Sequence, residues 1–263
     1  MTNFFSVNIR NFKFFHISVR IFVVAVAFVV DFSPWYLLWT FMAYLTYFTI
    51  GQSIMMHRYY SHNMFEFNNV ATKWLFILIT IMSARGAPIG WSYIHRVHHA
   101  NVDNEDDPHS PHNPGFSILK ISDTNNMSGN IQPLKVRNLL TKENLRLTDY
   151  YWLYALTVPV IMILLSVELF YYGWLVPVFM FQILSQIFNY ANHYHIVGSY
   201  KSHSTGKVGH SVNNILLWTL TLGEAWHNNH HAQPGNLNFG QKWWELDPSY
   251  WIIKLVKKDR NDN

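Results

Sequence analysis

Histidine, which occurs 15 times in this chain of 263 residues, is the residue type whose spacing most directly predicts chemistry. Eight of the histidines lie in three short clusters, HRYYSH, HRVHH and HNNHH. In the second and third clusters the imidazoles stand at positions i, i+3 and i+4, which share one face of an α-helix. Two such helices that face each other can enclose a pair of metal ions. The eight residues are His57, His62, His95, His98, His99, His227, His230 and His231.

The number and type of these ligands restrict the metal. A structural zinc ion takes four protein ligands and a catalytic zinc ion takes three and a water molecule, so these histidines suit two ions better than one. Imidazole binds zinc, copper, iron and nickel, so ligand type alone leaves the metal open. The chain has no cysteine and no HExxH motif, which argues against zinc deaminases and zinc proteases.

The first cluster has a different spacing. His57 and His62 are five residues apart, which separates them by about 140° on an α-helix. They cannot share a site on an unbroken α-helix, so we expect the helix to end at about Tyr59 and the chain to turn back over it. Isolated histidines, such as His16 and His203, are expected to be ordinary surface or interfacial residues.

The composition indicates a membrane protein. Half of the residues are apolar, 17% are aromatic and 13% are charged, whereas soluble domains have about 25% charged residues. The mean hydropathy of +0.02 indicates that a sizeable part of the chain lies outside lipid.

The segment Trp74 to Met82 is too short to span the membrane and is expected in the interface or the core. Four segments are expected to span the membrane as two hairpins joined at DFSP and ELFYYG, namely residues 17–30, 35–56, 150–167 and 171–190.

The distribution of charge predicts the orientation. The two hairpin turns carry Asp31 and Glu168 and contain no Lys or Arg, and the 19 Lys and Arg are assigned to the opposite side. The positive-inside rule therefore places both termini and all three histidine clusters in the cytoplasm. Residues 57–149 and 191–263 would form one cytosolic cap on a single domain, 1–263. No dense basic run is present, so a nucleic-acid partner is not expected.

The three clusters and their flanks resemble the histidine boxes of membrane fatty acyl desaturases, most closely the delta-9 type. The resemblance rests on HRYYSH, WSYIHRVHHANVDNEDDPHSP and GEAWHNNHH, and on the tail HHAQPGNLNFGQKWWELDPSYWIIKLVKK. It extends from about Thr49 to Lys258, although Ala225 stands where glycine is usual. It implies an all-α integral membrane fold, with four transmembrane helices in two hairpins and a helical cytosolic cap that holds a di-iron site.

The resemblance also implies two iron ions, O2 as co-substrate and a ninth ligand. That ligand is His193 in NYANH, and Asn189, four residues earlier, would reach an iron through water. Carboxylates are expected to hold the other ring nitrogen of the ligands; the candidates are Asp103, Asp106, Asp107 and Glu224.

The activity implied is O2-dependent insertion of a cis double bond, at the delta-9 position, into a saturated acyl chain carried on CoA or lipid. The chain has no HPGG haem motif, so a separate electron donor of the cytochrome b or ferredoxin type is expected. The host would be the endoplasmic reticulum or a bacterial inner membrane. Phe41 and Leu45 are candidates for limiting chain length, and Arg58, Arg96 and Lys201 for meeting a phosphate-bearing carrier.

Two other functions remain open from the sequence. A membrane hydroxylase acting on fatty acids or alkanes would use a similar di-iron cluster but insert oxygen. A metal transporter or sensor would place ionisable residues within its spans. These spans hold almost none, which favours the desaturase.

Overall fold

The computed structural model describes residues 9–108, 110–112, 132–204 and 208–259. This part is mostly helical, and its one sheet pairs β1 (Ser199–Tyr200) with β2 (Asn213–Asn214) in antiparallel register. The helices are α1 (Ile9–Val26), α2 (Pro34–Thr46), η1 (Tyr47–Ser61), α3 (Val70–Met82), α4 (Pro88–Ala100), η3 (Pro133–Leu139), α5 (Lys142–Asp149), α6 (Tyr151–Leu165), α7 (Val167–Phe170), η4 (Tyr171–Leu175), α8 (Val176–His193), α9 (Trp218–Thr221), η5 (Leu222–Ala225), α10 (His227–Ala232) and α11 (Pro248–Val256).

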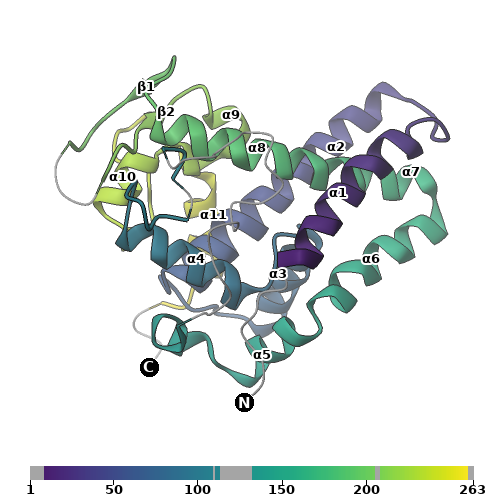
Figure 1. Ribbon diagram of the computed structural model, residues 1–263, viewed down its shortest axis with the longest axis horizontal. Coiled ribbons are helices and arrows are strands. Elements are labelled where there is room, and N and C mark those ends of the chain that lie inside the picture. The colour runs from purple at the N-terminus through teal and green to yellow at the C-terminus, as the bar shows by residue number, and fades with distance from the viewer. Residues whose placement is uncertain (1–8, 109, 113–131, 205–207, 260–263) are drawn as a thin grey trace.

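The long helices extend toward one end of the molecule, away from α10 and the small sheet (Figure 1). They form two helical hairpins, and α8 contacts both α1 and α2. The first turn is DFSP, as predicted, and Pro34 begins α2 at a position where its missing N–H costs no hydrogen bond. The second turn lies at Ser166, whose hydroxyl accepts N–H bonds from Glu168 and Leu169. The predicted turn at ELFYYG is therefore wrong, because this capping starts a new helix that includes those residues.

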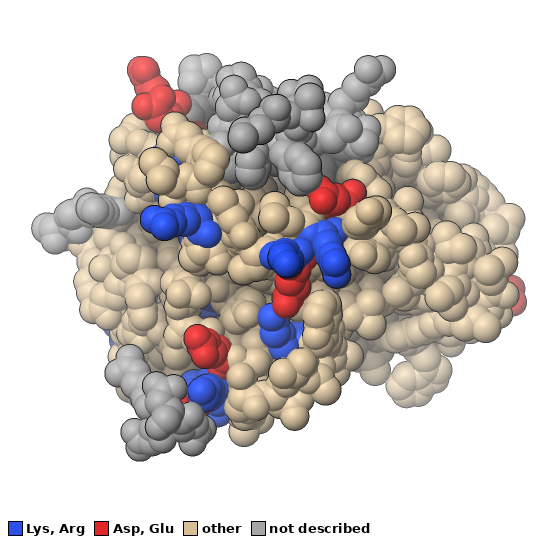
Figure 2. Space-filling model, turned by 90° about the horizontal axis from the view of Figure 1, so that it is seen from below, with Lys and Arg blue, Asp and Glu red and all other residues tan. Residues whose placement is uncertain are grey.

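Membrane-spanning length is clearest in the second hairpin. Within the described residues, the continuous helix Val167–His193 is long and apolar enough to cross a membrane, and Lys142–Asp149 with Tyr151–Leu165 would count as a second span despite a 64° bend. Large apolar side chains are exposed on the outer faces of α1, α2, α3 and α6. Figure 2 shows one face on which the visible Lys and Arg lie in the middle and on the left, away from the right-hand end where Figure 1 places the hairpin turns.

The helix that carries His57 does not end at Tyr59, contrary to the prediction. The chain stays helical from Pro34 to Ser61, but from Tyr47 onward it forms a π-helix. In a π-helix the N–H of residue i+5 binds the carbonyl of residue i. This wider turn, rather than a reversal of the chain, brings residues five apart to the same face.

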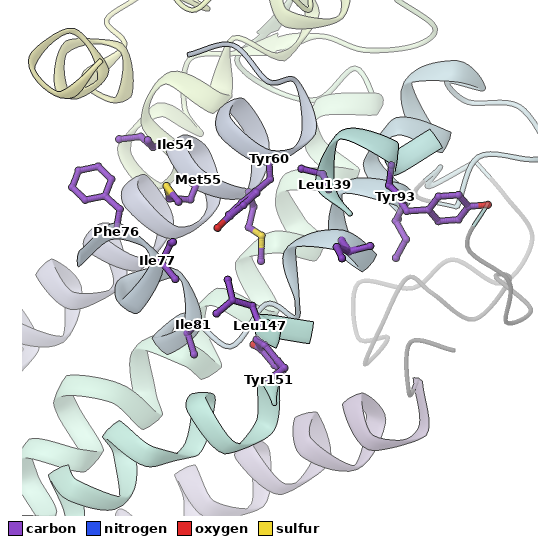
Figure 3. Close-up of a cluster of buried hydrophobic side chains, with 14 of the residues drawn as sticks. Ile54, Met55, Tyr60, Phe76, Ile77, Ile81, Tyr93, Leu139, Leu147 and Tyr151 are labelled. Atoms are coloured by element: carbon purple, nitrogen blue, oxygen red, sulfur yellow. The ribbon is translucent and has the colours of Figure 1, made fainter. Parts of the chain in front are cut away.

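The core beneath this π-helix fixes its position. η1 packs against α3 and α4, and side chains of η1 and α3 such as Met55 and Ile77 share one buried cluster with Leu147 and Tyr151, which lie beside Ile81 in Figure 3. The helix α3 is longer than the segment from Trp74 to Met82, because Asn69 caps it and accepts the N–H of Thr72. Its inner face is buried against η1, whereas its outer face exposes Trp74 and Leu75.

Candidate metal centre

Nine histidines from four helical regions converge at the cap end of the long helices. The last turn of η1 leads to His57 and His62, α4 and α10 carry three histidines each, and α8 ends at His193. Their ring nitrogens form two groups, and within each group the possible ligand atoms all lie within 4.8 Å of one another. The first group has five histidines and the second has four: His57, His62, His95, His99 and His230; and His98, His193, His227 and His231.

The rings meet through their Nε2 atoms. In the five-histidine group, His230 Nε2 lies 2.8 Å from His57 Nε2 and 2.9 Å from His99 Nε2. His62 and His95 bring their Nε2 atoms to 2.9 Å. The four-histidine group forms a chain in which His193, His227, His231 and His98 are linked by Nε2 distances of 3.1, 2.9 and 3.2 Å.

Carboxylates hold the opposite nitrogen of three rings. His57 Nδ1 lies 2.6 Å from Glu224 Oε2, and His98 Nδ1 lies 2.8 Å from Asp107 Oδ2. His193 Nδ1 lies 3.0 Å from the carboxylate of Asp103. In a neutral ring whose Nδ1–H is donated to a carboxylate, Nε2 carries a lone pair and no proton.

This proton arrangement fits a bound cation. In the four-histidine group His98 and His193 present lone pairs, so the only protons for the three Nε2 contacts belong to His227 and His231. Two protons can make at most two of the three contacts hydrogen bonds. An ion at the centre would instead be held by the lone pairs of all four rings.

Burial keeps these rings in the state that binds metal. Burial, with a smaller contribution from the neighbouring His57 and Arg96, lowers the pKa of His62 from 6.5 to about 2. Burial also lowers the pKa of five other rings well below 6.5: His95, His99, His227, His230 and His231. Neutral imidazole is the form that coordinates metal.

The carboxylates remain ionised despite their burial. Burial raises the pKa of Glu224, but the electrostatic attraction and hydrogen bonds of its neighbours His57, Arg58 and Ser53 outweigh burial and hold that pKa below its usual value. The pKa of Asp103 falls to about 2, because its bonds with His193 and His210 outweigh the effect of burial. Of the four carboxylates expected to contact the ligands, Asp103, Asp107 and Glu224 do so, whereas Asp106 is exposed.

A pocket of about 70 Å³ opens onto both histidine groups. His57 and His95 of the first group and His98 and His227 of the second line it. Asn189 also lines it. The remaining wall combines four aromatic and four polar side chains: Phe48, Trp91, Phe181 and Phe188; and Gln52, Arg85, Ser185 and Glu224.

The residues expected at the substrate lie in varied places. Phe41 and Leu45 pack against the core of the long helices and do not line this pocket. Lys201 is exposed, and its Nζ donates to Gly209 O over 3.3 Å. Arg96 is half-buried and donates to main-chain carbonyls at Tyr60, Ser61 and Lys135.

Arg58 differs most from its expected place. Its side chain has no exposed surface, and its guanidinium binds the carboxylates of Glu224 and Asp247. A contact with a phosphate-bearing carrier requires an accessible cation, and this position does not provide one.

Sequence reasoning missed several residues of the site. Arg85 lines the pocket, donates to Ser185 Oγ over 3.2 Å and lies 4.9 Å from the ring centre of Phe181. Positive φ angles at Ala84 and Gly86 flank it, so the backbone conformation there is unusual. The basic residue in an otherwise apolar stretch was the signal available in the sequence, since charged groups within apolar segments mark function.

Comparison with known proteins shows which family this chain resembles. The family model described as fatty acid desaturase matches residues 33–257. An sn-2 palmitoyl-lipid 9-desaturase of Nostoc sp. (strain 36) is 28% identical over 86% of this chain and 81% of its own. An sn-1 stearoyl-lipid 9-desaturase of Synechocystis sp. is 29% identical over 92% of this chain and 76% of its own. A chloroplastic palmitoyl-monogalactosyldiacylglycerol delta-7 desaturase of Arabidopsis thaliana is 28% identical, over 82% of this chain and 58% of its own.

Proposed function

Because this chain belongs to the fatty acid desaturase family, we propose that it introduces a cis double bond at the delta-9 position of a saturated acyl chain. The acyl chain would be carried on CoA or on a lipid, and the names of the relatives favour a lipid. The delta-7 relative shows that double-bond position varies among similar proteins. The observation that carries the proposal is the convergence of nine imidazoles into two adjoining groups beside one aromatic pocket.

The metal would be iron, one ion in each histidine group. All nine histidines would be ligands, and Asn189 would contribute to the four-histidine group through water. Two iron ions supply the chemistry that this reaction needs, namely O2-dependent oxidation of an unactivated methylene. Electrons would come from a separate cytochrome b or ferredoxin type of donor.

The protein's own part is to orient the ligands and the substrate. Glu224, Asp107 and Asp103 hold the Nδ1 protons of three rings and thereby fix the direction of each Nε2 lone pair. The aromatic side chains of Phe48, Trp91, Phe181 and Phe188 form an apolar part of the pocket wall, which suits a methylene chain.

The proposed membrane arrangement has four spans. They are α1, the continuous α2 and η1, the bent pair α5 and α6, and the continuous helix Val167–His193. The apolar residues exposed on α1, α2 and α6 support lipid contact, since a contiguous exposed apolar surface of this kind marks a membrane-facing region. The metal centre, both termini and the cap would lie on the cytoplasmic side, with Asp31 and Glu168 at the opposite face.

Expression of the full chain in a desaturase-deficient host tests the activity. Fatty-acid profiling by mass spectrometry is expected to show acyl chains that have lost two hydrogens at one position. His193→Ala is expected to abolish this product. His203→Ala is the matched control, because His203 bonds Gln241 outside both histidine groups. Products that gain oxygen would instead indicate a hydroxylase, and an unchanged profile would contradict the proposal.

A further inference from the structure

We propose that Arg58 and Asp247 are positioning residues that hold the five-histidine group in its binding geometry. Through them, the C-terminal segment 237–247 would complete the metal centre, although it contributes no ligand. This inference rests on the proposed metal-dependent function.

The guanidinium of Arg58 is enclosed by hydrogen-bond acceptors. Its Nη1 lies 2.7 Å from Glu224 Oε1, and its Nη2 lies 2.8 Å from Asp247 Oδ2. Nη1 also donates to the carbonyl and the hydroxyl of Ser53, and Nε donates to Leu237 O over 3.2 Å. All three nitrogens are therefore bound, and their geometry is fixed because the guanidinium is planar.

Glu224 transmits this geometry to a histidine. Its Oε1 accepts hydrogen bonds from Nη1 of Arg58 and from the hydroxyl of Ser53, the latter over 2.5 Å. Its other oxygen, Oε2, receives Nδ1 of His57. The carboxylate thus has no rotational freedom left, and the ring of His57 is held with Nε2 directed toward His230.

Asp247 fixes the opposite side of the guanidinium. The same Oδ2 that binds Arg58 accepts the N–H of Phe239, over 2.9 Å, and Oδ1 accepts the N–H of Tyr250 at the start of α11. The carboxylate lies so close to Gly223 that a Cβ there would be 2.0 Å from Oδ1. The segment before α11 is therefore locked against the residue that precedes Glu224.

Phe239 adds a second link from this segment to the ligands. Its ring lies under the guanidinium of Arg58, 3.6 Å from the ring centre, which is a cation–π contact. The same ring lies 4.3 Å from that of His230 and 5.3 Å from that of His57, measured between centroids. A displacement of Arg58 would therefore disturb two members of the five-histidine group at once.

The four-histidine group is held differently, which provides an internal control. Asp107 accepts the main-chain N–H of Asp103, and Asp103 accepts that of His210, over 2.8 and 2.7 Å. Besides the rings of His98 and His193 and the hydroxyl of Ser110, the described contacts of these two carboxylates thus run to main-chain donors rather than to Arg58. Loss of Arg58 or Asp247 should weaken one metal site and spare the other.

The test measures metal binding by the purified full chain. The variants are Asp247→Asn, which keeps the shape of the side chain, Arg58→Gln, and Arg58→Lys, which keeps the charge. Iron(II) is titrated into the metal-free proteins, iron per chain is measured by mass spectrometry, and Mössbauer spectra of ⁵⁷Fe distinguish the two sites. Lys73→Gln is the control, since Lys73 forms an ion pair with Glu143 at a distance from the metal centre.

We expect Asp247→Asn and Arg58→Gln to weaken binding at one site by about 10- to 100-fold, the usual effect of losing a partner that orients a ligand. The Mössbauer signal of the other site should be unchanged. Arg58→Lys should recover part of the loss, because charge is restored without the planar fork. Lys73→Gln should match the unsubstituted protein.

The inference is overturned if a folded Asp247→Asn variant binds iron at both sites as tightly as the unsubstituted protein. It is also overturned if both sites weaken equally, because that result indicates a general structural role. Failure of the proposed function gives a different result, since the unsubstituted protein would then bind no iron.

Discussion

His62 donates its main-chain N–H to the carbonyl oxygen of His57, five residues earlier, over 3.1 Å. This bond belongs to a π-helical turn, and it brings the two rings to a centroid distance of 5.0 Å. π-Helical turns are frequent at functional sites. Here the turn allows one continuous helix to supply two histidines to the same group.

Because a π-helical turn brings His57 and His62 together, we expect their spacing of five residues to be required for iron binding. In the double variant Ser61→His/His62→Ala the histidine moves to the four-residue spacing of an α-helix. We expect it to lose iron from the five-histidine group as His62→Ala alone does, because position 61 faces inward and its hydroxyl binds Met56 O. Metal analysis measures the loss, with Ser61→Ala as the control. Recovery of full iron content would show that an α-helical spacing serves equally well.

Asp107 and its neighbour Asp106 form a matched pair for testing the carboxylates. Asp107→Asn should lower the metal affinity of the four-histidine group by about 10- to 100-fold, since the carboxylate binds His98 Nδ1 through both oxygens. Asp106→Asn should have no effect, because Asp106 is exposed. Iron titration of both variants measures the difference, and equal affinities would contradict the role given to Asp107.

The pocket wall predicts which substitutions change the products. Phe48→Leu and Phe181→Leu enlarge the space beside the histidines, so they should shift the products toward longer or bulkier acyl chains. Leu45→Ala should have a smaller effect, because Leu45 packs behind that wall. Leu38→Ala is the control, since Leu38 is exposed on α2. Gas chromatography of the fatty acids measures the shift, and the opposite ranking would assign the length limit to the deeper residue.

The buried imidazoles predict how stability depends on pH. Burial lowers the pKa of His62 to about 2 and that of His95 well below 6.5. Below pH 6.5 the unfolded chain therefore binds more protons than the folded metal-free protein, and the free energy of unfolding falls as the pH falls. Each such ring costs about 1.4 kcal/mol per pH unit in this range.

Thermal unfolding of the metal-free protein in detergent measures this dependence. Between about pH 8 and 7 the rings are neutral in both the folded and the unfolded protein, so we expect the melting temperature to change little. At about pH 5 we expect the melting temperature to be lower than at pH 7. The fall should be less steep in His62→Gln, which has one fewer buried imidazole. A melting temperature that rises on acidification would contradict the assignment.

The histidines could be predicted from sequence because their spacing is local. The i, i+3, i+4 pattern identifies shared helix faces, and the NYANH motif identifies His193 through the family resemblance. The first hairpin turn was equally clear, since Pro34 marks the start of a helix. The second was wrong because an apolar aromatic run such as ELFYYG gives no sign of whether it turns, whereas the cap at Ser166 does.

Other features depend on contacts that no local pattern records. Arg58 and Asp247 are 189 residues apart, and a basic residue beside a histidine cluster suggested a surface contact instead. No residue type in the π-helix marks the change from α-helical to π-helical hydrogen bonding, so its hydrogen-bond register could not be read from the sequence. Pocket residues such as Arg85 become apparent only when α8 is placed opposite the turn after α3.

Metal analysis of the purified full chain tests the two-ion centre most directly. The unsubstituted protein should bind two iron ions per chain, one for each group of histidines. His99→Ala should remove the ion of the five-histidine group and His231→Ala that of the four-histidine group, each leaving one. A single ion in the unsubstituted protein, or two ions that survive both substitutions, would contradict the proposed centre.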